Sequence, residues 1–215
     1  MTNNSWNSQD PVQVAKGGTG IATTTAYSVL CGGTTATGAF QNVSGLGTAG
    51  HVLISAGAAA LPAWGLQKLV QYVQTSTSAT DDLTTLFPFD DTIPQNTEGE
   101  EVLTLAITPK NASNILVIKF NSFGSVTNTG CVAALFQDAT AGALSASIWI
   151  SALTDIMFNG VLNYKMAAGT TSATTFKIRM GPVNPGQHVY VNGSAGGRLF
   201  GGVGSTTLEI WELTP

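Results

Sequence analysis

The chain has 215 residues, of which only 9% are charged, and its formal net charge is −4. Typical soluble proteins are about 25% charged. Lys and Arg form no cluster, and this argues against a nucleic-acid-binding protein, which carries a basic patch or stripe. The start, MTNNSWNSQDP, lacks the basic and apolar regions of a signal peptide, and no apolar run approaches the roughly 18 residues of a membrane span. We expect a protein that is neither exported through a cleaved leader nor inserted in a membrane.

The first predicted segment, residues 1–15, is polar apart from a few side chains and ends close after the sequence PVQV. A polar terminal segment with isolated apolar side chains is typical of a docking peptide or of a frayed arm. We predict that Trp6, Pro11, Val12 and Val14 make the docking contacts of this arm.

The second segment, residues 16–66, is rich in Gly, Thr and Ala, and no Asp, Glu, Lys or Arg occurs from Gly17 to Gln67. Three loose Gly-rich units, GGTG, GGTTATG and GLGTAG, are each followed by a short apolar patch, which is typical of brief strands and turns. So little apolar area does not offset the entropy of ordering the glycines, and a disordered segment would be more polar and more charged. We therefore predict an extended shaft that is ordered by contact with other chains.

From Lys68 the pattern changes, and we predict a single domain over residues 67–215. Its apolar segments are short, and most alternate with a period of two, which places successive side chains on opposite faces of a sheet. Two segments, 115–120 and 131–136, are nearly continuous apolar runs, as in strands buried on both faces. The predicted strands are 102–108, 115–120, 131–136, 161–166, 176–180, 188–191 and 207–213. With turn residues in every interval and no helical periodicity, this indicates an all-β sandwich or barrel, and an eight-stranded jelly roll fits best.

Few residues are suited to catalysis or metal binding. The only histidines are His51 and His188, and neither lies near a nucleophile-elbow sequence. Three copies of His51 around a threefold axis would give a metal site, but an exposed or stacked imidazole is the simpler interpretation. Cys31 and Cys131 lie in different segments, and we expect two buried thiols rather than a disulfide. We predict no enzyme activity, no cofactor and no bound metal.

Acidic and aromatic side chains are the remaining candidates for a site. Seven acidic residues lie between Asp81 and Glu101, without the spacing of an EF-hand loop, and we interpret them as a solvated loop rather than a calcium site. Exposed aromatic rings stack on sugars and anchor recognition, whereas most large aromatics are buried in a core or an interface. The aromatic candidates for a receptor or glycan contact are Trp149, Tyr164, Tyr190, Phe200 and Trp211.

Two stretches resemble a known family. The first, VAKGGTGIATTTAYSVLCGGTTATGAFQNVSGLGTAGHVLISAGAAALPAWG, is similar to the shaft-like linker before the head domain in many tail fibres and related virion proteins of bacteriophages. The second, TLFPFDDTIPQNTEGEEVLTLAITPKNASNILVIKF, followed by YKMAAGTTSATTFKIRMGP and GGVGSTTLEIWEL, resembles the C-terminal head of the same proteins. Together the stretches cover roughly positions 12–215.

This resemblance implies a homotrimer with a TNF-like or C1q-like β-sandwich head and a role in the virion, usually host attachment. The arm would then bind another structural protein of the virion, and the head would bind a glycan or protein of the host surface. Assembly would take place in the host cytoplasm, and the protein would end in the tail or a fibre. Capsid-vertex and baseplate fibres remain open as locations.

Two other functions stay open at this point. One is a purely structural virion part, such as a decoration, baseplate or vertex protein that binds no receptor. The more distant one is a cellular C1q-like carbohydrate-binding module. Glycan binding by the purified protein separates receptor binding from the purely structural role.

Overall fold

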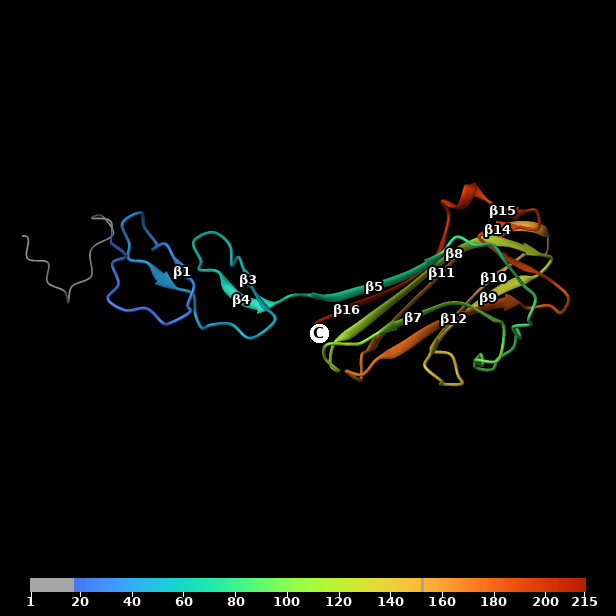
Figure 1. The fold of residues 1–215 in the computed structure, drawn as a ribbon, viewed down its shortest axis with the longest axis horizontal. Coiled ribbons are helices and arrows are strands. Elements are labelled where there is room, and N and C mark those ends of the chain that lie inside the picture. The colour runs from blue at the N-terminus through green and yellow to red at the C-terminus, as the bar shows by residue number, and fades with distance from the viewer. Residues whose placement is uncertain (1–17, 152) are drawn as a thin grey trace, which may run out of the picture. The chain divides into compact units, whose positions relative to one another are not determined.

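The computed structural model describes residues 18–151 and 153–215, which form two compact units that divide between Gln67 and Lys68 (Figure 1). The described residues contain strands and one short 3-10 turn, η2 (Phe200–Gly202), and no α-helix. The predicted all-β class is therefore confirmed. Outside the described residues lie the predicted docking contacts Trp6, Pro11, Val12 and Val14.

The described part of the first unit consists of two antiparallel hairpins. In one, β1 (Leu30–Cys31) pairs with β2 (Gln41–Asn42), and in the other, β3 (His51–Ile54) pairs with β4 (Ala63–Leu66). The strands are short because Gly and Ala interrupt these segments, and neither residue has the β-branched or aromatic side chain that favours a pleated sheet.

In each hairpin of the first unit, a residue at or next to the second strand donates a hydrogen bond to the glycine-containing segment that precedes the hairpin. The indole of Trp64 in β4 donates a hydrogen bond of 3.2 Å to the carbonyl of Gly45. The same ring lies against Gly47, where a Cβ would be only 2.9 Å from it, and the φ of 76° at Gly47 also favours glycine. In the other hairpin, the backbone N–H of Phe40 donates to the carbonyl of Thr19 at 2.8 Å. In both hairpins, a backbone carbonyl of the preceding segment is therefore the acceptor; the donor is a side chain at Trp64 and a backbone N–H at Phe40.

The second unit, Lys68–Pro215, is built almost entirely of antiparallel strands. The strands are β5 (Leu69–Thr77), β6 (Asp81–Leu83), β7 (Glu100–Ile107), β8 (Ile115–Thr127), β9 (Gly130–Gln137), β10 (Ser145–Ile150), β11 (Thr154–Ala167), β12 (Thr174–Pro182), β13 (Val189–Val191), β14 (Gly193–Ser194), β15 (Gly197–Arg198) and β16 (Thr206–Leu213). The short pair β14 and β15 forms a separate small hairpin.

The longer strands form two sheets with the order of a jelly roll. In the first sheet β16 lies between β5 and β8, β11 lies on the other side of β8, and β13 and β6 continue the sheet beside the later half of β8. The second sheet has the order β10–β9–β12–β7. Numbered along the chain as β5, β7, β8, β9, β10, β11, β12 and β16, these strands run 1-8-3-6 and 2-7-4-5. This is the order of two linked Greek keys, so the jelly-roll prediction is confirmed.

The core lies between the two sheets, and alternate residues of each strand point into it. Ile118 and Phe120 of β8, Phe176 and Ile178 of β12, and Ile210 of β16 are fully buried there. The prediction that the segment 115–120 is buried on both faces is wrong, because its outward residues are half-buried or, at Lys119, exposed. The outward face of residues 115–120 is therefore at least partly open to solvent.

β9 is the strand that is buried on both faces, as predicted for 131–136. Cys131, Ala133 and Leu135 face the main core. Val132, Ala134 and Phe136 face outward and pack with Phe87, which comes from the long connection between β6 and β7. The connection is fixed to the sheet by the backbone hydrogen bond from Phe87 to the carbonyl of Pro182, at 2.8 Å. It therefore acts as a second cover on this sheet.

Candidate functional site

The structure brings three of the five predicted aromatic contacts to the outward side of one sheet. Tyr190 lies on β13, Trp211 on β16, and Phe200 in η2, where its ring packs on Phe123 of β8 at 5.7 Å between centroids. By strand alternation, Phe123 is on the outward face of β8. These residues do not form one cluster, because Tyr190 pairs with the later half of β8 and Trp211 with the earlier half.

The rings of His188 and Tyr190 form a parallel stack, which we call the His–Tyr ledge. Their centroids are 5.7 Å apart and their planes differ by 7°. Because His188 and Tyr190 are two residues apart in an extended segment, their side chains point to the same face. Both residues are half-buried. The Nδ1 of His188 lies 2.8 Å from the carboxylate of Asp82, which belongs to β6 and is the register partner of Tyr190. The ledge is thus held by a side chain that is 106 positions away in the chain.

Negative charge surrounds the ledge. Burial, followed by the charges of Asp82 and Asp155, raises the pKa of Tyr190 above its ordinary value. Asp155 is the extra residue of a bulge in β11, with a φ of 55°, and it accepts a long hydrogen bond of 3.5 Å from Ser125. Among the described residues, His188 is the only basic side chain in an ion pair with either aspartate. The side chains that the structure places at the ledge are thus mainly acidic, and a negative potential attracts cations and repels anions.

Phe200 adds an exposed aromatic surface on the same sheet face. Its side chain is 67% exposed, although one side of the ring contacts Phe123. Its φ is 55°, a conformation that is uncommon for a bulky residue, and glycines follow at 201 and 202. Such a conformation at a projecting aromatic residue is more frequent at functional positions than elsewhere.

Trp211 forms a second polar and aromatic patch on the earlier half of the same sheet. Its ring contacts Tyr72 of β5 at 4.7 Å between centroids, and the ammonium of Lys119 lies 5.8 Å from its centre. The indole N–H donates to Glu209 at 3.2 Å, and the hydroxyl of Tyr72 donates to Gln74 at 2.9 Å. Burial, and then the charge of Glu209, raises the pKa of Tyr72. The polar groups of this patch are already paired with each other.

The other two predicted contacts point toward the core. Trp149 is half-buried, packs against the core and stacks on Phe158, with centroids 5.9 Å apart and planes 22° apart. Tyr164 of β11 is also half-buried against the core. Its position opposite Ile118, an inward residue of β8, explains this placement. The alternation of 161–166 already indicates two faces, but not which face is inward.

The histidines lie apart from each other along the chain and in different units. His51 is a half-buried residue of β3. His188 and Asp82 form a His–Asp pair like the base and acid of a hydrolytic triad, but over the ranges 18–151 and 153–215 no hydroxyl or thiol is hydrogen-bonded to the Nε2 of His188. Over the same ranges, His, Cys, Asp and Glu form no group of three that is placed to hold a metal ion. The absence of enzyme activity stays a prediction.

The sequence points to Tyr190 but not to its partners. The spacing of His188 and Tyr190 was a usable signal, since two residues apart on a strand face the same side. Asp82 and Asp155 gave no such signal, because only the jelly-roll topology brings β6, β13 and the start of β11 around the same half of β8. Both cysteines are free, in agreement with the expectation, although Cys31 is only half-buried.

Within the part of the chain that the structure describes, no helix has the length and apolar character needed to cross a membrane. No protein-family model and no curated protein matches the sequence.

Several solved structures show weak similarity. Dimeric latent PorU from Porphyromonas gingivalis has 10% identity and a TM-score of 0.32, over 69% of this chain and 13% of that chain. The VP2 subviral particle of infectious bursal disease virus has 14% identity and a TM-score of 0.30, over 77% of this chain and 43% of that one. The Gx strain of the same virus has 9% identity and a TM-score of 0.31, over 75% and 40%. The chain spans less than half the length of each, and similarities this weak carry no functional argument.

Proposed function

We propose that the protein is a virion fibre protein of a bacteriophage, a homotrimer whose jelly-roll unit contacts the host surface and binds a glycan or protein there without cleaving it. The observation that carries the proposal is the succession of two parts: a first unit without Asp, Glu, Lys or Arg from Gly17 to Gln67 and with exposed apolar side chains, and a jelly-roll second unit. The sequence resemblance to phage fibres supports the same combination.

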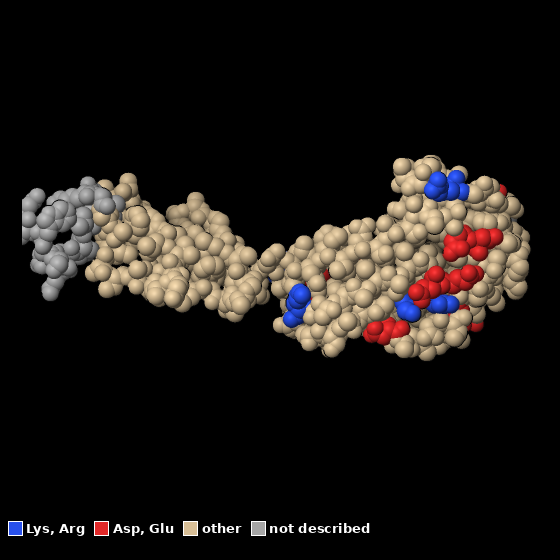
Figure 2. All heavy atoms as spheres, in the orientation of Figure 1, with Lys and Arg blue, Asp and Glu red and all other residues tan. Residues whose placement is uncertain are grey.

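The first unit has the surface expected of a segment that associates with its own copies. No charged residue occurs from Gly17 to Gln67, and Figure 2 shows neither acidic nor basic side chains on the visible face of its described part. Among its described large apolar side chains, only Val43 is fully buried. Exposed ones include Leu30, Leu46, Leu53 and Leu66 and, at 96%, Tyr27. Copies of the same segment around an axis would cover this apolar surface and close the assembly.

The His–Tyr ledge is the part of the second unit that best fits sugar recognition. Aromatic rings stack on the apolar face of a sugar ring, and carboxylates accept hydrogen bonds from its hydroxyl groups. Tyr190 and His188 supply the rings, Asp82 and Asp155 supply the carboxylates, and Phe200 extends the aromatic surface. We expect a neutral or amino-substituted glycan rather than one with carboxylate or sulfate groups.

The remaining parts of the proposal concern the particle. The arm of residues 1–15 would dock onto another structural protein of the virion, in the tail or a fibre, after assembly in the host cytoplasm. Several fibres on one particle would convert weak single contacts into firm attachment, because each further contact becomes intramolecular.

Three experiments test the proposal: native mass measurement, competition with phage adsorption, and a substitution in the His–Tyr ledge. Native mass measurement should give three chains, and purified protein should bind bacterial host cells and slow adsorption of intact phage. Tyr190→Ala should weaken cell or glycan binding by about tenfold or more, as expected for an aromatic anchor. Phe89→Ala, which removes an aromatic side chain that is 66% exposed on the β6–β7 connection, should leave binding unchanged.

Other results would contradict parts of the proposal. If saturating protein neither binds cells nor slows adsorption, the purely structural virion role replaces receptor binding. If the bound polysaccharide becomes shorter, the protein is an enzyme.

A further inference from the structure

The two aspartates beside the His–Tyr ledge differ in how their charge is balanced. Asp82 lies 2.8 Å from the Nδ1 of His188, which balances its charge when protonated. Asp155 is exposed, and within the ranges 18–151 and 153–215 it takes part in no ion pair. Its hydrogen bond from Ser125 is long, at 3.5 Å. Asp155 therefore presents a carboxylate charge that the described part of the chain does not neutralise.

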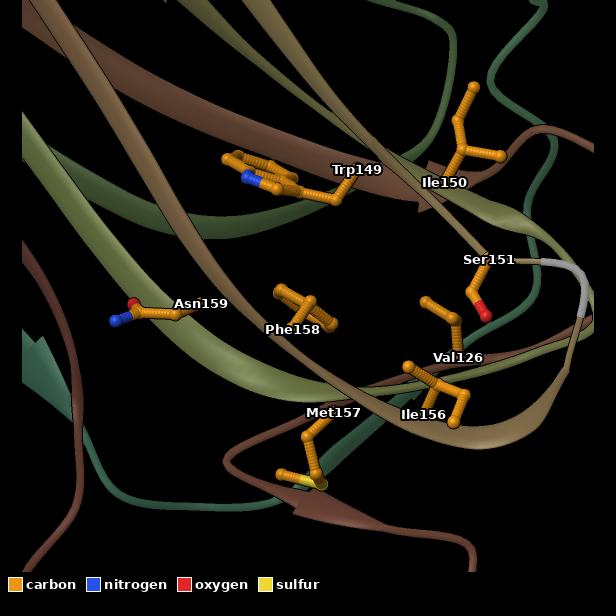
Figure 3. A pocket seen from close by; sticks show the side chains of 8 residues that line it. All are labelled: Val126, Trp149, Ile150, Ser151, Ile156, Met157, Phe158 and Asn159. Carbon is orange, nitrogen blue, oxygen red and sulfur yellow. The ribbon is translucent and has the colours of Figure 1, made fainter.

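A bulge in β11 places Asp155 on the outward face of its sheet. The register of β11 on β8 shifts between Thr154 and Ile156, and Asp155 is the extra residue. Figure 3 shows the next residues, with Ile156 on one side of the strand and Met157 on the other. Met157 is the register partner of Ser125, to which Asp155 is hydrogen-bonded. Bulges of this kind re-aim a side chain, often next to a functional site.

The carboxylate of Asp155 and the ring of Tyr190 converge above Ser125. Ser125 lies in β8, between β11, which carries Asp155, and Tyr190, its register partner in β13. Neighbouring strands are about 4.8 Å apart, so side chains from β11 and β13, about 10 Å apart, can meet over a small serine. Ser125 is fully buried although strand alternation points it outward, so its neighbours close over it. Burial, and then the charges of Asp82 and Asp155, raise the pKa of Tyr190, in agreement with this proximity.

One face of the Tyr190 ring is left uncovered by its own strand. His188 stacks on the other face, with planes 7° apart. In a regular strand, Asn192 would be the next side chain on the same side. Asn192 instead has a φ of 57° and is fully buried, and its amide donates to the carbonyls of Thr77 and Ala79 at 3.0 and 2.9 Å. β13 thus leaves room for a ligand group against Tyr190.

An aromatic ring beside an unneutralised carboxylate is suited to an organic cation. A ring face attracts an ammonium group within about 6 Å of its centre, and a carboxylate accepts a charge-assisted hydrogen bond from it. Calcium takes about six to eight oxygen ligands, whereas the described His, Cys, Asp and Glu side chains form no group of three that is placed to hold a metal ion. A sugar that carries the amine also uses the ledge, because its apolar face stacks on aromatic rings.

We propose that Asp155 selects a glycan with a free amino group, whose ammonium binds between the Asp155 carboxylate and the Tyr190 ring. This inference rests on the proposed glycan binding at the His–Tyr ledge and adds the charged group that the ledge selects. An N-acetylated glycan of the same backbone lacks the charge and leaves the carboxylate without a cationic partner, so it binds more weakly.

Two oligosaccharides of equal length test the selection with the full-length chain: an oligomer of glucosamine and its fully N-acetylated counterpart. In calorimetric titration at pH 6, the wild type should bind the glucosamine oligomer at least about tenfold more tightly. Asp155→Asn should lose this preference. Asparagine has nearly the same shape and tolerates the φ of 55° at this position, so the fold should persist, and circular dichroism checks this.

Asp91→Asn is the matched control. It removes the same charge from an exposed position on the β6–β7 connection and should keep the preference for the glucosamine oligomer. The control separates a site at Asp155 from general attraction between a cationic oligomer and a chain with a net charge of −4.

Binding to bacterial host cells gives a second readout. Asp155→Asn should weaken cell binding by about tenfold or more, and Asp91→Asn should leave it unchanged. Cell binding that persists in Asp155→Asn overturns the inference and leaves receptor binding standing.

The remaining outcomes also separate this inference from the function on which it rests. If the wild type shows no preference between the oligosaccharides, or if Asp155→Asn keeps the preference, the inference is wrong, and receptor binding stands as long as Tyr190→Ala still weakens cell binding. Competition for cell binding by Ca²⁺ or by a lysine-rich peptide, but not by the glucosamine oligomer, overturns it too, because the ligand is then an inorganic ion or a protein. A wild-type protein that binds neither cells nor either oligosaccharide overturns both proposals.

Discussion

The side-chain amide of Asn114 donates a hydrogen bond of 2.5 Å to the carboxylate of Glu212, and both residues are buried. The same carboxylate accepts hydrogen bonds from the side chain of Gln71 at 2.5 Å and from the backbone N–H groups of Lys110 and Asn111 at 2.8 and 3.3 Å. Glu212 therefore ties β16 to β5 and to the β7–β8 connection. Burial raises its pKa, but these hydrogen bonds outweigh burial and leave the pKa below its ordinary value.

Glu212→Gln should destabilise the second unit. A glutamine keeps the shape of the side chain but places an NH₂ group among donors, so that buried donors lose their acceptor. Hydrogen bonds to a charged group contribute about 1.5–3 kcal/mol each, and we expect a loss of about 2–3 kcal/mol in the free energy of unfolding, measured by denaturant titration. Glu101→Gln, which removes a partly exposed ion pair with Lys177, is the control and should cost less than about 1 kcal/mol. Equal effects of the two substitutions would contradict the structural role of Glu212.

The same carboxylate should make stability depend on acid pH. A group whose pKa is lower in the folded than in the unfolded state stabilises the fold above its unfolded pKa, near 4.5 for a glutamate, and loses this contribution as the pH falls through the folded pKa. The wild-type protein should therefore lose more unfolding free energy between pH 7 and pH 3 than Glu212→Gln does. Denaturation at both pH values measures the difference. Parallel losses would show that Glu212 does not contribute to the pH dependence.

Alanine substitutions of two phenylalanines on the β6–β7 connection should have very different effects on the free energy of unfolding. Phe87 is fully buried against the outward face of β9, whereas Phe89 is exposed. Phe87→Ala should cost about 3–4 kcal/mol, because it removes a buried ring and leaves a cavity above Ala134 and Phe136. Phe89→Ala should change stability by less than about 0.5 kcal/mol. A small effect of Phe87→Ala in chemical denaturation would show that the connection does not cover the sheet.

The two thiols should also differ in reactivity. Cys131 is fully buried, and burial raises the pKa of its thiol well above the ordinary value, whereas Cys31 is half-buried. Since the thiolate is the reactive form, native protein should be alkylated at Cys31 at least about tenfold faster than at Cys131. Denaturant should remove the difference. Fast modification of Cys131 in the native protein would mean that the core of the second unit opens readily.

The contrast between β8 and β9 shows which part of the fold the sequence predicts. Both strands contain nearly continuous apolar runs, and both were recognised as strands. Local sequence does not show that Phe87 and its neighbours return to cover β9, whereas the outward face of β8 stays open around Lys119. Strand β10, with the sequence SASIWI, is not predicted from the sequence, because only its last three residues are large and apolar.

In the candidate site, too, the sequence predicts the local feature but not the contacts between distant strands. An aromatic residue at position 190 with a histidine two residues earlier is visible in the sequence. The carboxylates beside them come from β6 and from a bulge in β11, and such distant residues meet only through the order of strands in the sheet. For Trp149 and Tyr164, strand alternation does not show which face of the strand is inward. In the structure both side chains pack against the core.

The central place of β16 in its sheet has a consequence for how the protein is made. This strand is the last in the second unit, yet it lies between β5, the first, and β8, and it pairs along its length with both. During synthesis the sheet therefore stays divided until residues 206–213 have left the ribosome, and pairings so distant in sequence form slowly. A chain that is released early exposes the edges of β5 and β8 and becomes a substrate for proteases or an aggregation seed. Only chains that have been translated through Leu213 can therefore contribute a closed second unit to an assembly.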